Sequence, residues 1–384
     1  MTKRLGFLFL AILMVVMGRG GPGALAQMPP NEQVTVLQLP AYSPHWIATM
    51  TPLSGSIMMT PIVLIDGDTH KVLGNLSGGL AAMFAPSPDH KFFYLADTFY
   101  SRGTQGDRTD VLSIYDATHL SRIGEIPITS KRQLALADPS SMGVTPDGRF
   151  VLLLNLTPAT SVTAVDLDGK KVAGEIQTPG CSEILILGDR QFASVCADGS
   201  MLTTDFDDSA KTTSQKRTAK PFFDVEKDPV FQLPAMIDKK AYFVSYHGMV
   251  YPMDLGVSPA EPAERWSMLS DAEKKEGWRP GGWQPVAGYT PGHLIFVLMH
   301  QGGEWTQKSA GPEVWVYDVN DHKRVARIPM PLQSNAIKVS QDDNPLLFAL
   351  VTSESKLQIF SALKGRYLGT VNEVSQHPYT LFGL

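Results

Sequence analysis

Short apolar runs alternate with turn-forming polar clusters along almost the whole chain, and this pattern recurs seven times. The second half of each repeat contains two apolar strands joined by a polar turn, over residues 63–76, 112–128, 162–176, 202–215, 250–266, 314–328 and 357–371. Most of these turns contain an aspartate, a residue that tolerates turn dihedrals. Hairpin repeats of this length are typical of propeller blades. The pattern therefore predicts an all-β fold: a seven-bladed β-propeller with four-stranded antiparallel blades.

The first half of each repeat carries a hairpin of its own, such as the turn Thr145–Gly148 before the apolar run Arg149–Asn155. Near the start of the chain, Val34–Leu39 reads as a strand that has no partner in its own repeat. We expect it to complete the last blade and close the ring, so that no sheet edge is left exposed. Because propellers grow by adding blades, residues 34–384 are predicted to form one domain.

The N-terminal residues have the pattern of an export signal. Two basic residues precede the apolar run Leu5–Met17, and Ala24-Leu25-Ala26 supplies small residues for cleavage. This predicts a secretory signal peptide over residues 1–26, cut near Ala26-Gln27, and a flexible lead-in over 27–33. The alternative is an uncleaved membrane anchor, but the apolar run is short for a permanent span. We expect an exported protein, located in a bacterial periplasm and free of the membrane after cleavage.

The net charge bears on which partners this chain can bind, and its cysteine content bears on whether it forms a disulfide. The formal net charge of −5 becomes −8 when the three basic residues of the leader are removed. An acidic chain without basic tracts argues against nucleic acid as a partner. Cys181 and Cys196 are the only cysteines. In an exported protein we expect them to form a disulfide rather than a metal site, because neither a histidine nor a third cysteine lies near them in the sequence.

Two segments are longer than a hairpin requires, and such segments often carry binding residues. One is Tyr100–Asp110, a polar loop between two strands, in which Arg102 and Arg108 either anchor a partner carboxylate or pair with neighbouring aspartates. In the other, a capping box at Ser270–Glu273 and a stop at Gly277 predict a short helix. The residues that follow it combine interface-prone types, namely Trp278, Arg279 and Trp283, as do Glu304 and Trp305 in the next repeat. For each tryptophan, packing between blades is the alternative.

The chemistry of a self-contained active site is missing from the sequence. The nine histidines form no H-x-H or H-E-x-x-H pattern, and the chain has no C-x-x-C-H, no phosphate-binding loop and no G-x-S-x-G turn. Adjacent carboxylates, as at Asp207-Asp208, stand in turns where aspartate is expected for backbone reasons. We therefore expect this chain to carry no catalytic residues, metal or cofactor of its own.

The chain resembles the heavy subunit of quinoprotein amine dehydrogenases, the family of methylamine dehydrogenase and aromatic amine dehydrogenase. The resemblance covers most of the mature chain. It is strongest at Ser101-Arg102-Gly103 with Gly106–Asp110, at the turn Thr145–Gly148, at Cys181 with Cys196 and the following Asp198–Ser200, at Asp271–Glu273, at Glu304-Trp305 with Lys308, at Val339–Asp342 with Pro345–Leu347, and at Gly277–Gln284, which reads Gly-Trp-Arg-Pro-Gly-Gly-Trp-Gln. This last motif is the most specific of them.

The resemblance implies a seven-bladed propeller, exported to the periplasm, that joins a small cysteine-rich light subunit in a two-plus-two heterotetramer. The tryptophan tryptophylquinone cofactor would be on the light subunit. The implied reaction is oxidative deamination of a primary amine to an aldehyde and ammonia, with electrons passing to a blue copper protein similar to amicyanin or azurin. In the family an aromatic residue after a Gly-Gly pair overhangs the substrate pocket. Here Leu80 follows Gly78-Gly79 and Phe84 comes slightly later.

Two other functions remain open on sequence grounds. A stand-alone exported propeller that binds a ligand or protein without redox chemistry fits the repeats equally well. An enzyme with its site in the central channel is disfavoured by the missing nucleophile and metal patterns. The amine also remains open, because residues 222–253 resemble the aromatic-amine branch and the turn at Ser340 resembles the methylamine branch.

Overall fold

The computed structural model describes residues 38–51, 59–134 and 137–384. The chain divides into two units, Met1–Leu37 and Gln38–Leu384, and the account below concerns the second. The predicted leader at 1–26, the lead-in at 27–33 and most of the predicted strand Val34–Leu39 lie outside the described residues.

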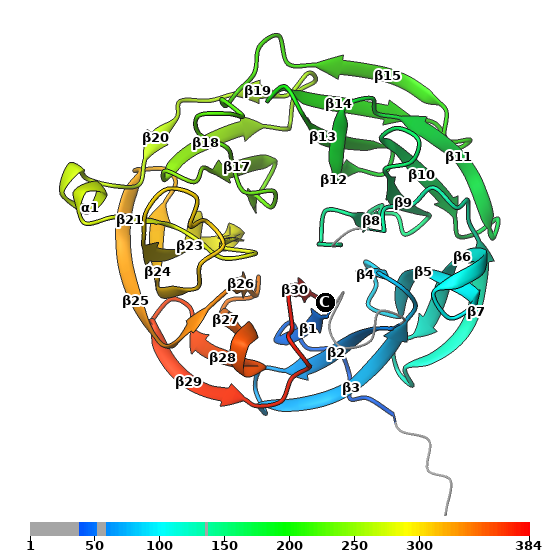
Figure 1. Ribbon diagram of the computed structural model, residues 1–384, viewed down its shortest axis with the longest axis horizontal. Coiled ribbons are helices and arrows are strands. Elements are labelled where there is room, and N and C mark those ends of the chain that lie inside the picture. The colour runs from blue at the N-terminus through cyan, green and yellow to red at the C-terminus, as the bar shows by residue number, and fades with distance from the viewer. Residues whose placement is uncertain (1–37, 52–58, 135–136) are drawn as a thin grey trace, which may run out of the picture. The chain divides into compact units, whose positions relative to one another are not determined.

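Seven antiparallel sheets form a ring in the unit Gln38–Leu384, as predicted (Figure 1). In order from the innermost strand, the first three sheets are β30 (Thr380–Gly383), β1 (Trp46–Met50), β2 (Thr60–Asp66) and β3 (Lys71–Gly78); β4 (Met83–Pro86), β5 (Phe92–Arg102), β6 (Gln105–Asp116) and β7 (Ser121–Pro127); β8 (Met142–Val144), β9 (Phe150–Asn155), β10 (Ser161–Asp166) and β11 (Lys171–Gln177).

The next two sheets are β12 (Cys181–Gly188), β13 (Gln191–Cys196), β14 (Met201–Phe206) and β15 (Thr212–Arg217); β16 (Ala235–Ile237), β17 (Lys240–Val244), β18 (Met249–Asp254) and its two outer partners β19 (Glu261–Pro262) and β20 (Trp266–Ser267). In the sixth sheet two short segments share the inner position, and the last two sheets are β21 (Trp278–Pro280) with β22 (Val286–Tyr289), β23 (Leu294–Gln301), β24 (Gly311–Asp318) and β25 (Lys323–Ser334); β26 (Ala336–Val339), β27 (Leu346–Val351), β28 (Lys356–Ser361) and β29 (Arg366–Val371).

The hydrophobic core lies between neighbouring blades. The middle strands β9, β10 and β27 are buried at every position, whereas the outer strand β15 is almost wholly exposed. One core cluster joins Phe296 of the sixth blade to Phe360 of the seventh, and another joins Phe150 of the third blade to Phe192 of the fourth. Each blade therefore needs its neighbours to bury both faces, which is why the repeat pattern predicted a ring.

The ring is closed in the first blade, by a strand from the C-terminus. β1, β2 and β3 come from the start of the described chain, and β30 pairs with β1 as the innermost strand. The last blade is complete with its own four strands β26–β29. The prediction that an N-terminal strand completes the last blade is therefore wrong. The first blade combines strands from the start and from the end of the described chain. This arrangement closes the ring, which is the purpose that the prediction gave to the N-terminal strand.

The two faces of the ring carry different connections. Because successive strands are antiparallel, the turns between the first and second strand and between the third and fourth strand of each blade lie on one side, which we call the turn face. The connections between the second and third strands, and those between blades, lie on the other side, which we call the loop face.

Helices are few. The predicted helix is α1 (Asp271–Lys275), with Ser270 as its N-cap and a complete capping box with Glu273, and Gly277 follows it at φ +80°. In Figure 1 it lies outside the ring of sheets. Two single 3₁₀ turns, η1 (Thr290–Gly292) and η2 (Thr352–Glu354), complete the described helical structure. None of the described helices has the length and apolar character that crossing a membrane demands.

Candidate functional site on the loop face

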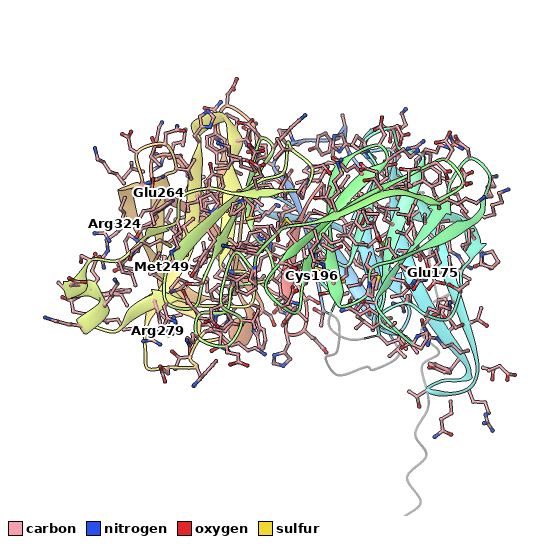
Figure 2. All side chains as sticks on the ribbon, turned by 90° about the horizontal axis from the view of Figure 1, so that it is seen from above. Glu175, Cys196, Met249, Glu264, Arg279 and Arg324 are labelled. Carbon is pink, nitrogen blue, oxygen red and sulfur yellow. A yellow bond between two sulfur atoms is a disulfide. The ribbon has the colours of Figure 1, made fainter. Side chains whose placement is uncertain are left out.

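Nearly all the residues predicted for contact fall in the connections on the loop face or in the strand segments beside them. These connections are β3–β4 with Leu80, β5–β6 with Arg102 and Arg108, β20–β22 with Trp278, Arg279 and Trp283, and β23–β24 with Glu304 and Trp305. In Figure 2, which views the ring edge-on, the long β5–β6 hairpin and Arg279 lie toward the same side. Segments far apart in sequence thus share one surface, which the sequence alone did not show.

The motif Gly277–Gln284 belongs to the sixth blade and makes backbone contacts with the seventh before the chain returns to the sixth blade in β22. Its first part, β21, pairs with β23. The chain then leaves the sheet, and the backbone N–H of Trp283 donates to the carbonyl of Asn335 at 2.6 Å. Gly282 makes this approach possible, because it has φ +132° and a Cβ there would lie 2.4 Å from the Asn335 oxygen. Only glycine combines that backbone conformation with so close a contact.

Gln284, at the end of this motif, forms hydrogen bonds with β30, the strand that closes the ring. Its side-chain oxygen accepts from the N–H of Leu381 at 2.9 Å and from the hydroxyl of Thr380 at 2.6 Å, and its amide donates to the carbonyl of Leu381 at 3.1 Å. The N–H of Ile337 in β26 also donates to its backbone carbonyl at 2.8 Å. One buried glutamine therefore links the sixth, seventh and first blades.

The two tryptophans of the motif have different surroundings. Trp278 is buried against Trp315, with ring centroids 5.0 Å apart, and Arg327 lies over its ring at 4.9 Å. Trp278 also belongs to a core cluster that includes Val244 and Trp266 of the fifth blade, so its position matches the alternative of packing between blades. Trp283 is half-buried on the loop face, where its ring contacts Tyr379 at 4.8 Å and the Lys308 ammonium lies 4.7 Å from its centroid. Trp283 is therefore the one with surface available to a partner.

A short network shapes the loop 302–309. Arg279 donates through Nη1 to the carbonyl of Gly303, which also accepts from the Thr306 hydroxyl at 2.7 Å. The His300 Nε2 lies 2.9 Å from the same hydroxyl. Burial, with the nearby Arg279 charge, lowers the pKa of His300, so this imidazole is held neutral at pH 7. Between Gly303 and Thr306 in this loop, Trp305 has a left-handed backbone conformation, φ +63°, and 70% of its surface is exposed.

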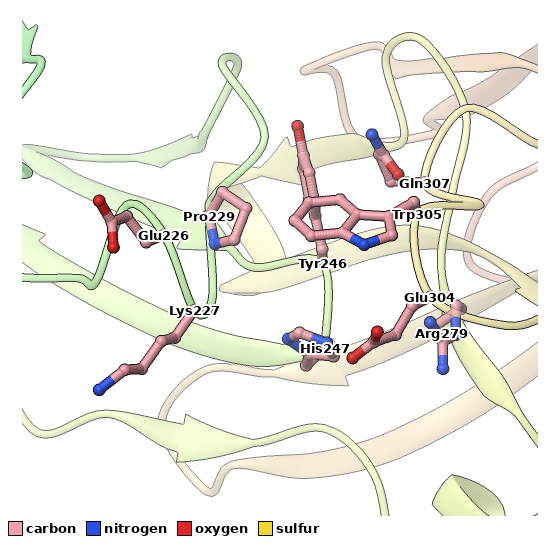
Figure 3. A pocket seen from close by; sticks show the side chains of 9 residues that line it. All are labelled: Glu226, Lys227, Pro229, Tyr246, His247, Arg279, Glu304, Trp305 and Gln307. Atoms are coloured by element: carbon pink, nitrogen blue, oxygen red, sulfur yellow. The ribbon is translucent and has the colours of Figure 1, made fainter.

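A cavity of about 260 Å³ opens beside Trp305, between the fifth and sixth blades (Figure 3). Arg279, Glu304 and Trp305 line it from the sixth blade, and Tyr246 and His247 line it from the fifth. His247 pairs with Asp228 at 2.9 Å. Sequence analysis found the sixth-blade residues but missed Tyr246 and His247, because a tyrosine and a histidine after a strand look like any hairpin end.

Tyr100–Asp110 is an extension of the hairpin rather than a loop, so that prediction is wrong. β5 and β6 stay paired through Tyr100 and Arg108, and the turn lies at Gly103 and Thr104. The alternative that an arginine pairs within the segment is confirmed for Arg108, whose Nε lies 2.8 Å from the buried carboxylate of Asp110. Arg102 is exposed and forms no ion pair with another described residue.

A buried arginine that sequence analysis missed anchors the β3–β4 connection. Arg132 donates to the carbonyls of Leu80 at 2.6 Å and Ala81 at 2.7 Å, and its Nε donates to Thr98 at 3.0 Å. Its guanidinium also lies 3.5 Å from the Asp110 carboxylate, and both side chains are fully buried. Burial lowers the pKa of Arg132 to about 10, which leaves it charged at neutral pH. No pattern around Arg132 distinguishes it from a surface arginine.

Asp97 supports the same connection from the other side. It accepts from the N–H of Gly79 at 2.8 Å and from the hydroxyl of Ser113 at 2.6 Å, and burial raises its pKa. Leu80 is thus held half-buried on the loop face. Phe84 is fully buried in β4, packed against Phe93 and Phe382 with ring centroids 5.7 and 5.2 Å away. Of the two residues after the Gly-Gly pair, only Leu80 retains exposed surface.

The predicted disulfide between Cys181 and Cys196 is confirmed, and it joins β12 to β13 at the loop-face end of the fourth blade. Within residues 38–51, 59–134 and 137–384, no three or more histidine, cysteine, aspartate or glutamate side chains gather closely enough to hold a metal ion.

Comparison with known proteins identifies the family. The model of the methylamine dehydrogenase heavy chain family matches residues 53–383. The chain belongs to this family. A methylamine dehydrogenase heavy chain from Methylophilus methylotrophus is 30% identical over 99% of this chain and 95% of its own length. Another from Methylorubrum extorquens is 33% identical over 82% of this chain and 77% of its own. The predicted resemblance is thereby confirmed.

Solved structures agree with the propeller fold. A functionally unknown protein from Desulfotomaculum acetoxidans superposes with a TM-score of 0.59 at 10% identity, covering 88% of this chain and 98% of its own. A putative 6-phosphogluconolactonase from Bacteroides fragilis gives 0.59 at 12% identity, covering 92% and 99%. At such identities these matches show the fold alone. All the candidate residues of the loop face fall inside the range matched by the heavy-chain family.

Proposed function

We propose that this chain is the heavy subunit of a periplasmic, tryptophan tryptophylquinone-dependent amine dehydrogenase. It pairs with a catalytic light subunit, two copies of each, in the oxidative deamination of a primary amine to an aldehyde and ammonia. The quinone on the light subunit supplies the two-electron oxidation, and a blue copper protein accepts the electrons. The role of this chain is to hold the light subunit and to form part of the wall of the substrate channel.

The observation that carries the proposal is the heavy-chain family match over residues 53–383. A second observation supports a location on the loop face: most of the motifs that carry the resemblance, those within 101–110, 181–200, 277–284 and 304–308, lie there, whereas the turns 145–148 and 339–342 lie on the turn face. The predicted leader at residues 1–26 supports export, and the pair Cys181–Cys196 is consistent with an oxidising compartment.

The loop face has the residue types of a docking surface. Trp305 is 70% exposed, and Trp283 and Arg279 lie on the same face. Tryptophan, tyrosine and arginine are enriched among the residues that dominate binding energy at interfaces. A large aromatic ring kept in water by a left-handed backbone is costly in a free chain, and a partner that covers it recovers that cost. We therefore propose that the light subunit docks over Trp283 and Trp305.

Leu80 is the proposed contribution to the substrate channel. It follows Gly78-Gly79, and Arg132 fixes its backbone through two carbonyl hydrogen bonds. A rigid backbone with a partly exposed apolar side chain suits a pocket wall, because the side chain then limits the size of the bound amine. The candidate substrates are methylamine, aromatic amines and other primary amines.

The proposal is tested by expressing the chain with and without a light subunit of its family. Alone, the chain should show no quinone absorption and oxidise no amine. With the light subunit it should elute as a two-plus-two complex that reduces a copper protein or an artificial acceptor when amine is added. Amine oxidation by the purified chain alone would contradict the proposal, as would failure to bind any light subunit.

Substitution of the exposed tryptophan locates the docking surface. Trp305→Ala should weaken light-subunit binding at least tenfold, because removal of an interface aromatic commonly costs about 2 kcal/mol or more. The matched control is Leu363→Ala, which removes a side chain that is 54% exposed in the turn between β28 and β29, on the turn face. It should leave binding unchanged. An equal effect of the two substitutions would contradict docking on the loop face.

A further inference from the structure

The central channel contains a lysine that has no role in the proposed docking. Lys338 lies in β26, an innermost strand, two residues before the turn to β27. Its side chain borders three neighbouring cavities of about 250, 330 and 360 Å³. The walls come from across the ring, including Met142 of β8, Ile184 of β12 and Met236 of β16. Lys338 therefore reaches into the channel rather than into a single blade.

The surroundings of Lys338 are mostly apolar and offer no counter-charge. No described residue forms an ion pair with it or accepts a hydrogen bond from its Nζ. The titratable groups that share its cavities are Tyr42, His90 and Asp342, and Leu384 also lines one of them. Asp342 pairs with His45 at 3.1 Å, the Leu384 carbonyl accepts from the Tyr42 hydroxyl, and His90 stacks on the Tyr42 ring. Each of these groups already has another partner.

An ammonium group in such a place is unfavourable. Moving a charged ammonium out of water without a partner costs far more free energy than moving a neutral amine. The protonation equilibrium therefore shifts toward the uncharged amine. Burial accordingly lowers the pKa of Lys338, and no neighbouring charge contributes to the shift. An ordinary lysine with a pKa near 10.4 is uncharged in roughly one molecule in 2,500 at pH 7, and each unit of lowering raises that fraction about tenfold.

An uncharged lysine amine in a cavity is a nucleophile toward carbonyl compounds. We propose that Lys338 is a reactive amine that binds small aldehydes covalently and reversibly in the central channel. Its Nζ attacks the aldehyde carbon, the carbonyl oxygen leaves as water with the two amine hydrogens, and a C=N bond replaces C=O. The step needs no oxidant or reductant. Cavities of this size have room for an aldehyde of a few heavy atoms.

The proposed function provides a source for such a ligand, because oxidative deamination of a primary amine releases an aldehyde. This link alone rests on the proposed function. The reactivity of Lys338 does not, since it follows from the channel of the isolated chain. The test therefore uses the isolated full chain, without a light subunit, and its outcome is separate from that of the docking experiments.

The test is reductive trapping followed by peptide mass spectrometry. The chain is treated at pH 7 with limiting formaldehyde and cyanoborohydride, which converts an imine into a stable methylamine. Lys364, exposed in the β28–β29 turn of the same blade, is the internal reference. We expect Lys338 to be modified at least tenfold faster than Lys364, and this ratio to shrink as the pH is raised toward 10.

Two further results decide the matter. Lys338→Met, checked for an unchanged circular dichroism spectrum, should lose the fast phase of modification while Lys364 still reacts. A small molecule that fills the cavity without reacting should slow the fast modification of Lys338. It should leave the modification of Lys364 unchanged. Modification of Lys338 at the rate of Lys364 or more slowly would overturn the proposal, because that result means a protonated or inaccessible amine.

Discussion

At the scale of single residues, two tryptophans of one motif have different structural roles. Trp278 and Trp283 stand five positions apart in one motif, yet one is buried against Trp315 and the other lies on the loop face. The two cysteines could be paired in advance because there was only one way to pair them. Arg132 could not be found, because only long-range contacts distinguish a buried arginine from a surface one.

Arg132 should be essential for stability. Arg132→Met leaves the carboxylate of Asp110 and the carbonyls of Leu80 and Ala81 without their donor. Removing one partner of a buried ion pair costs about 3–5 kcal/mol, and urea unfolding measures it. In the control Arg122→Met, the lost partner is Glu125, at 2.8 Å and half-exposed. That change should cost less than about 1 kcal/mol. Equal losses would show that the buried network is not stabilising.

Two glutamates should respond to pH in opposite directions. Burial, and secondarily the Asp138 charge, raises the pKa of Glu183 well above its usual value. The folded chain therefore favours the protonated carboxyl group of Glu183. The contribution of this group to folding stability is lost as pH rises through its folded-state pKa. Glu183→Gln should therefore stabilise the chain at pH 7–8 and have little effect near pH 4.

Glu175 provides the control. A hydrogen bond from Lys131 is the main cause that lowers the pKa of Glu175, so its carboxylate stabilises the fold above the unfolded pKa and loses this effect as pH falls through the folded value. Glu175→Gln should destabilise at neutral pH and become neutral in acid. Thermal melts of both variants between pH 4 and pH 8 measure the two trends, and trends of the same sign would contradict the assignment.

At the scale of elements, strands, turns and the helix were predictable because each depends on local chemistry. The capping box at Ser270 and Glu273 formed as expected. The sequence of Tyr100–Asp110 predicted a loop although the segment is a hairpin extension, because it lacks the alternating apolar residues of a strand. Beyond the blade, both faces of a strand pair are in water, so alternating apolar residues are not needed and the usual signal of a strand disappears.

The backbone contact between the motif 277–284 of the sixth blade and Asn335, just before the seventh blade, should depend on one glycine. Gly282→Ala puts a Cβ 2.4 Å from the Asn335 carbonyl at φ +132°, so strain and overlap should cost at least about 2 kcal/mol. Gly303→Ala is the control, because a Cβ there meets no atom within 4 Å. It should change the free energy of unfolding by less than about 0.5 kcal/mol. Chemical denaturation measures the free energy of unfolding of both variants. An unchanged value for Gly282→Ala would contradict the close backbone contact at Gly282.

At the scale of the whole molecule, the number of blades followed from the repeats, but the strand that closes the ring did not. The prediction assigned closure to Val34–Leu39 and did not consider the last residues of the chain, because the hydrophobic pattern does not say which strand pairs with β1. The structure uses β30, whose Leu381 and Phe382 are buried. The gathering of candidate residues on one face was also hidden, because it depends on strand direction around the ring.

Closure should dominate the stability of the ring. Deleting residues 379–384 removes β30 and the partners of Gln284, and it exposes the inner edge of β1. Burial of Leu381 and Phe382 alone is worth about 2–3 kcal/mol for each side chain. We expect a large fall in the urea midpoint. Deletion of Leu384 alone is the control, and a similar fall in both would contradict a special role for β30.

The central claim is that the loop face holds a catalytic partner subunit. The most direct measurement is amide hydrogen exchange of this chain, free and bound to a light subunit. The account predicts new protection in residues 278–284 and 302–308, with no change in the turn-face segments 340–345 and 361–365. Protection confined to the turn face, or a stable complex without protection on the loop face, would contradict it.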